Sequence, residues 1–181
     1  MPVDEAAADA ALFDGAVACE LTARVRIAPG APPAGSAEAA ERLLRDLAMM
    51  EERRGESDEA AHPPDPALRR LEAKLDLTLQ LLAQALPALA PPPSRAVRFS
   101  ARGLRIDASP SDAAIADDSA TLAWQPGDGL PLLAHLPVRR LACIGERSWW
   151  AFEPLEPAVA DLLERHVFRL HRRWLAAHRR G

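Results

Sequence analysis

The 181-residue chain lacks the short motifs that mark common catalytic sites. It has no GxSxG, no P-loop and no GxGxxG, the local signatures of acyl transfer and nucleotide binding. Five histidines are present, but no pair has the HxxxH or HExxH spacing that places two imidazoles on one helical face. We therefore expect no enzymatic activity, no metal site and no cofactor.

Cysteines and long apolar runs are also scarce. Cys19 and Cys143 are the only two cysteines, and they form no CxxC pair. Both lie in apolar, strand-like stretches, so we predict that both are small buried hydrophobes in a reducing compartment. No apolar stretch approaches the roughly 20 residues of a membrane span, and the N-terminus is acidic where a signal peptide needs positive charge. These absences predict a cytoplasmic protein.

The chain has no excess of positive charge. Its formal net charge is −4, with acidic residues gathered near the start and arginines gathered in residues 165–180. General nucleic-acid binding normally needs a basic balance and is disfavoured. The arginines suit the solvated C-terminal end of a helix. Attachment of that end to an anionic membrane surface is a weaker alternative.

The first regular pattern is an alternation of apolar and polar residues over 12–27, which predicts a strand with one buried face. A Pro/Gly-rich linker follows. Ser36 can cap the next helix, predicted over 37–54 and expected to end at Gly55. We assign this helix and the one after it to a single inserted region, residues 36–90.

The second helix of that region is predicted over 66–86 and carries a leucine stripe. Asp65 and Pro66 suit its start, and prolines from residue 91 forbid its continuation. The leucines recur at spacings of three or four, in the a, d and e positions of a heptad: Leu68, Leu71, Leu75, Leu79, Leu82 and Leu86. This is more apolar surface than a small domain usually covers. We therefore predict oligomerisation through this helix, as a tetramer or at least a dimer.

After the prolines the period changes to two, and short strands are predicted throughout residues 94–154, followed by a helix over 155–180. Closely spaced short strands favour a small barrel or sandwich. Trp149 and Trp150 are adjacent, so on a strand one faces inward and the other outward. We expect the outward indole to be covered by a neighbouring helix or subunit, although stacking on a base is the alternative. The fold class is α+β in a single domain, 1–181.

The order of these segments resembles the PilZ domain family, small β-barrels that bind cyclic di-GMP. "RFSARGLRI" is similar to the family's (Asp/Asn)-x-Ser-x-x-Gly stretch, "LPLLAHLPV" to its apolar middle strand, and "RRLACIG" with "SWWAFEPL" to the hairpin that follows. The chain most resembles the tetrameric, helix-augmented xanthomonad-type members. The resemblance implies a six-stranded barrel with inserted helices and a closing C-terminal helix. It also implies a role in signalling that controls pili, motility or virulence.

Departures from the family pattern fall in the ligand motif. Arg98, which can only donate hydrogen bonds, stands where the family has an acidic or amide acceptor for guanine. The family's Arg-x-x-x-Arg phosphate clamp is also missing, since Arg24 and Arg26 are at a spacing of two. We interpret Ser100 and Gly103 as a structural turn between two strands, with Gly103 at a bulge or a positive φ and Ser100 bonded to that backbone.

The sequence thus predicts a non-catalytic adaptor that assembles through its leucine helix, contacts proteins of pilus or motility signalling, and does not bind cyclic di-GMP in the usual way. The alternative is a genuine cyclic di-GMP receptor with a non-standard site. Its ligand residues would be Arg98, Ser100, Arg102 and Gly103.

Overall fold

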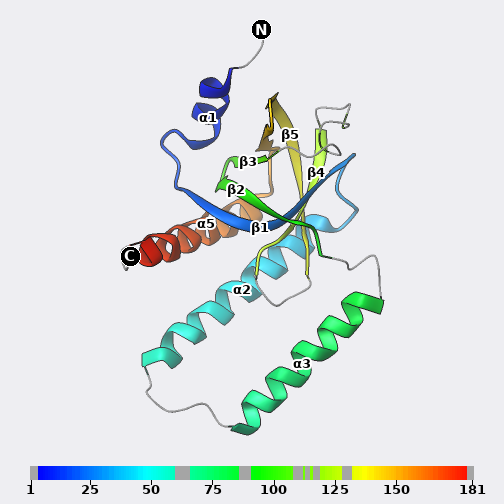
Figure 1. Ribbon diagram of the computed structural model, residues 1–181, viewed down its shortest axis with the longest axis vertical. Helices are drawn as coiled ribbons and strands as arrows, with labels where there is room; N and C mark the ends of the chain where they lie inside the picture. Colours follow the sequence, from blue (N-terminus) through cyan, green and yellow to red (C-terminus); the bar gives the residue numbers. More distant parts are fainter. Residues whose placement is uncertain are drawn as a thin grey trace.

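The computed structural model describes residues 4–59, 66–85, 91–107, 112, 115, 119–127 and 132–178. In chain order the elements are α1 (Glu5–Phe13), β1 (Ala18–Pro29), α2 (Ser36–Glu59), α3 (Pro66–Ala85), β2 (Ser94–Ser100), β3 (Gly103–Asp107), β4 (Ser119–Gln125), β5 (Ala134–Ile144), β6 (Arg147–Phe152) and α5 (Pro157–His178). Figure 1 shows the strands gathered into one body, with α2 and α5 beside it and α3 projecting away.

The six strands form a closed antiparallel barrel in the order β1-β2-β3-β6-β5-β4. Closure leaves no unpaired sheet edge among these strands. This confirms the predicted α+β class: a PilZ-like six-stranded barrel with inserted long helices and a C-terminal helix. β5 joins two segments that the sequence analysis treated as separate strands. It continues through an irregularity between Arg140 and Ala142, because a β-bulge lets a strand bend without ending.

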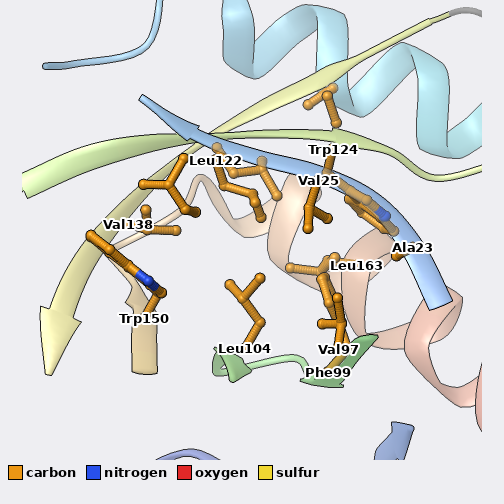
Figure 2. Close-up of a cluster of buried hydrophobic side chains, with 14 of the residues drawn as sticks. Ala23, Val25, Val97, Phe99, Leu104, Leu122, Trp124, Val138, Trp150 and Leu163 are labelled. Atoms are coloured by element: carbon orange, nitrogen blue, oxygen red, sulfur yellow. The ribbon is translucent and has the colours of Figure 1, made fainter. Parts of the chain in front are cut away.

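The barrel interior is filled by the alternating inward side chains of the strands. Figure 2 shows Trp150, Val138 and Leu104 directed into this interior, with Leu163 of α5 approaching from outside the sheet. Trp150, Leu104 and Leu163 are all fully buried. Phe99 stacks at a tilt on Trp124, with 4.9 Å between ring centroids. The period-two pattern therefore predicted the buried face of these strands correctly.

Two helices complete the core. In α5, Val159, Leu163 and Val167 belong to the barrel's hydrophobic cluster. In α2, Ala40, Leu43, Leu44 and Leu47 also pack there. Met50, one turn after Leu47, is 48% exposed, because the distal half of α2 extends beyond the barrel (Figure 1).

Two predicted boundaries are wrong. The first strand begins at Ala18 and not at residue 12, because the preceding residues form α1. Asp4 caps that helix by accepting a hydrogen bond from the Ala7 backbone N–H at 2.7 Å. The second wrong boundary is Gly55, which lies inside α2 and does not end it. One glycine costs a helix only about 1 kcal/mol, which its neighbours here offset.

The helix α3 covers Pro66–Ala85, as the leucine spacing predicted. Leu71 and Leu75 are each more than half exposed, and so are Leu77 and Leu81, which lie about a third of a turn around the helix from the first pair. The side chains of Leu68, Leu79 and Leu82, and the whole of Leu86, lie outside the described residues. The leucines that are described face solvent in the single chain.

Candidate functional site

The Ser-x-x-Gly stretch forms a tight turn between β2 and β3, and its polar groups are bonded within the chain. Ser100 is fully buried. Its Oγ donates to the Leu12 carbonyl oxygen at 2.8 Å and accepts from the Arg102 backbone N–H at 3.1 Å. The serine hydroxyl therefore holds the end of α1 on the turn that follows β2.

Gly103 is required by close packing. A Cβ at this position would lie 2.1 Å from the Trp150 carbonyl oxygen and 2.9 Å from both the Ala151 Cα and the Leu12 Cδ2. Its φ of 157° is also uncommon for other residues. The turn contains no bulge, since Ser100 pairs directly with Gly103. Gly103 is therefore needed mainly because β6 and α1 pack too close to this position for a side chain, and less because of the dihedral angles of the turn.

The outer face of the barrel carries a row of four side chains beside this turn. Across neighbouring strands Glu20 pairs with Arg98, Arg98 with Arg105, and Arg105 with Trp149. Two arginines directly opposite each other repel unless an anion lies between them. The Glu20 Oε1 lies 3.6 Å from the Arg105 Nη2, and the closer carboxylate comes from α1.

That carboxylate is Asp9. Its Oδ2 accepts from the Arg98 Nη1 at 3.2 Å and from the Arg105 Nη1 at 3.0 Å. Its Oδ1 accepts from the Trp149 Nε1 at 2.7 Å. Three donors on three strands therefore converge on one carboxylate, and the two arginine bonds are charge-assisted.

The rest of α1 covers the same surface. The Phe13 ring lies 4.4 Å from the Arg98 guanidinium carbon, in cation-π geometry. Ala8, Leu12 and Phe13 form a second hydrophobic cluster with Trp149, which is fully buried. The prediction that a helix would cover the outward indole is confirmed. Trp149 is the outward one and Trp150 lies in the barrel core.

The structure thus brings Arg98, Ser100, Arg102 and Gly103 together, with each of them contacting residues of α1 or the segment after it. Arg102 donates from Nη1 to the Asp14 carbonyl oxygen at 2.9 Å. Sequence reasoning missed α1 and the participation of Asp9 and Arg105. The available signal was an Asp4 cap followed by an alanine-rich run, which is typical of a helix start.

A second polar group lies between α2, α5 and the barrel. Glu51 of α2 approaches Arg169 Nε at 2.7 Å and Arg173 Nη2 at 2.9 Å. His166 is fully buried, and its ring lies edge-to-face with Trp124, with 5.3 Å between the ring centroids. Burial, with the positive charges of Arg169 and Arg173, lowers the pKa of His166 to about 3. This imidazole is therefore neutral at physiological pH.

The cysteines differ from each other. Cys19 is buried, and burial raises the pKa of its thiol to about 11. Cys143 is exposed near the end of β5, so the prediction that both are buried is wrong for Cys143. The strand end leaves the core there, and alternation no longer implies burial.

Within the described ranges no group of histidine, cysteine and acidic residues is arranged to hold a metal ion.

In the part of the chain that the structure describes, no helix combines the length and the hydropathy needed to cross a membrane. The basic end of α5 is partly neutralised. Arg165 pairs with Asp161 at 3.1 Å, in addition to the Glu51 contacts of its neighbours.

Comparison with known proteins agrees with this architecture. The family model for the atypical PilZ domain, described as a cyclic di-GMP receptor, matches residues 44–180. A crystal structure of a pathogenic protein from Xanthomonas campestris is described as a new tetrameric PilZ domain self-assembled via an unusual helical bundle. It is 33% identical, with a TM-score of 0.70 over 94% of this chain and 97% of that one. No curated protein matches. The chain belongs to the atypical PilZ domain family.

Proposed function

We propose that this PilZ domain is a non-catalytic signalling adaptor that assembles through α3 and does not bind cyclic di-GMP in the usual way. From the family resemblance we also expect a cytoplasmic role, through protein contacts, in the control of pili, motility or virulence. The observation that argues against usual cyclic di-GMP binding is the docking of α1 over the Ser-x-x-Gly turn and over Arg98.

A nucleotide at this turn would meet three obstacles. Arg98 replaces the acceptor for guanine, and unpaired guanine N–H groups typically cost ~1 to 3 kcal/mol. Arg24 and Arg26 lie exposed on the same face of β1 at a spacing of two, which differs from the family's clamp. Finally, the buried Ser100 hydroxyl is already bonded to Leu12, so the ligand would have to displace α1 as well. Together these effects weaken a micromolar affinity by several orders of magnitude.

Assembly through α3 is supported by its exposed leucines. A soluble helix with Leu71, Leu75, Leu77 and Leu81 all more than half exposed has an apolar surface that needs a partner. A second copy of α3 offers the same surface, and repeated copies form a bundle. The X. campestris protein, described as tetrameric via a helical bundle, gives the proposed assembly a precedent.

The alternative receptor is favoured by one observation, the matching family's description as a cyclic di-GMP receptor. It would use Arg98, Ser100, Arg102 and Gly103. Calorimetric titration of cyclic di-GMP into the full chain separates the two functions. The adaptor predicts no saturable heat at micromolar ligand. A dissociation constant near 1 μM, lost in an Arg98→Ala, Arg102→Ala variant, would establish the receptor instead and refute the proposal.

A further inference from the structure

The surface under α1 has two parts that together resemble a docking site for a helix. One part is polar: Arg98, Arg105 and the Trp149 indole N–H converge on the Asp9 carboxylate. The other part is apolar, where Trp149 packs with Ala18, Leu141, Ala142 and Ala151 against α1. We refer to the barrel residues of both parts as the α1-docking face; Asp9 itself belongs to α1 and is not included.

The helix that covers this face has little stability of its own. α1 has only nine residues, and an isolated helix of that length is unstable in water. Its buried side chains are Ala8, Leu12 and Phe13, so its order depends on the α1-docking face. Gly15 follows directly, with φ of 66° and no atom within 4 Å of the position a Cβ would take. Release of α1 would break the Ser100 and Arg102 hydrogen bonds to its C-terminal end, but it would leave the strand pairing of the barrel in place, because the barrel is closed by β1 to β6 alone.

The pattern on α1 defines what the face selects. Asp9, Leu12 and Phe13 are at i, i+3 and i+4, and therefore lie on one side of the helix. The carboxylate reaches the arginines while the apolar side chains cover Trp149. A small phosphate would satisfy the arginines but would leave this indole uncovered, since Trp149 is fully buried only with α1 in place. The face fits an acidic amphipathic helix better than it fits an anion alone.

We propose that the α1-docking face is the surface through which the adaptor engages its partner, and that the partner supplies an amphipathic helix with an acid-x-x-apolar-apolar spacing. This inference rests on the adaptor function proposed above. α1 occupies the face in the same chain and competes with the partner. A short linker raises the effective concentration of a tethered segment to roughly millimolar, so a partner needs matching complementarity or release of α1 before it binds.

The test uses a fluorescein-labelled peptide of residues 4–14 as the probe, and the full chain carrying Asp9→Ala and Phe13→Ala as the receptor. These changes weaken the tethered helix but leave the docking face intact. We expect saturable fluorescence anisotropy with this variant and at least tenfold weaker binding to the unmodified chain, where α1 competes. The same peptide with Asp9→Ala should bind the variant about tenfold more weakly or worse, because it loses the charge-assisted bonds.

Three outcomes would overturn the inference: no binding to a variant that remains folded by near-ultraviolet circular dichroism, equal binding of both peptides, or full displacement of the peptide by millimolar pyrophosphate at constant ionic strength. The last result would indicate a small phosphate ligand.

Hydrogen exchange provides a second, independent measurement. Amides of residues 5–13 should exchange at least tenfold faster in Asp9→Ala than in Asp14→Ala, which also removes one carboxylate but keeps the Asp9 bonds to Arg98 and Arg105 and the Asp14 carbonyl that accepts from Arg102. Equal exchange would show that Asp9 does not hold α1, and would overturn the inference. Cyclic di-GMP binding to the unmodified chain would refute the adaptor function, whereas failure of the peptide alone would refute only the docking face.

Discussion

Replacing Gly103 by alanine tests whether the Ser-x-x-Gly turn is kept for packing. The added Cβ would lie 2.1 Å from the Trp150 carbonyl oxygen and 2.9 Å from the Ala151 Cα. Both atoms belong to the backbone of β6, which pairs with β3 at this point. Because neither can rotate away, the barrel has to open locally between β3 and β6. The Leu12 Cδ2, also 2.9 Å away, would be pushed outward with α1.

The expected loss of stability follows from two contributions. Overpacking in a well-packed region costs about 1–3 kcal/mol, and an unfavourable backbone conformation adds about 1 kcal/mol. We expect a total of about 3 kcal/mol, or a fall in melting temperature of roughly 6–12 °C for a chain of this length. Differential scanning calorimetry at fixed protein concentration measures it, because assembly makes the melting temperature depend on concentration.

Gly145→Ala is the matched control. Gly145 has φ of 59°, but a Cβ there would meet no atom within 4 Å. Its substitution therefore carries only the cost of the left-handed conformation, about 1–2 kcal/mol, or roughly 2–8 °C. If Gly103→Ala melts no lower than Gly145→Ala, the close packing of β3 on β6 does not explain Gly103, and the turn must be kept for another reason.

Two further predictions concern buried titratable groups. His166 has a pKa of about 3 when folded and about 6.5 when unfolded, so the unfolded chain binds the extra proton as the pH falls below 6.5. Between pH 7.5 and 5.5 this lowers the free energy of unfolding by about 1.3 kcal/mol. Urea denaturation should detect the loss, which His166→Leu abolishes; an unchanged pH slope in that variant would contradict the assignment. At pH 8 iodoacetamide should label Cys143 in the folded protein. It should label Cys19, whose thiol is buried and has a pKa of about 11, only after unfolding in urea. Mass spectrometry showing equal labelling of both in the folded chain would refute the burial of Cys19.

Most strands were predictable because a barrel interior imposes period two on the segments that line it, although β4 is buried at every position from Ala120 to Trp124. Val97 and Phe99, for example, are buried while Arg98 between them points outward. The continuity of β5 was not predictable. The polar pair Arg139 and Arg140 interrupts the apolar pattern as a turn would, and a bulge leaves no clear sequence signal.

The occupant of the candidate site was harder to predict. Arg98 and Asp9 are 89 residues apart, and no local pattern connects them. α1 also has few large apolar side chains, so its periodicity is weak, and its burial of Leu12 was attributed to a strand. The absence of an acceptor at Arg98 was visible in the sequence, whereas Asp9, the carboxylate that accepts from Arg98 and Arg105, was identified only from the fold.

The exposed leucines of α3 hold copies of this chain together in the assembly that we propose. Size-exclusion chromatography with multi-angle light scattering measures it directly. We predict a mass of a dimer or a tetramer for the unmodified chain, and a monomer of 19.6 kDa for Leu71→Asp with Leu75→Asp, because four or more buried carboxylates cannot be accommodated in an apolar seam. Arg69→Asp, which lies about 80° or more around the helix from each of the four exposed leucines, should keep the assembled mass. A monomeric unmodified chain at high concentration, or an undiminished mass in the double variant, would contradict the claim.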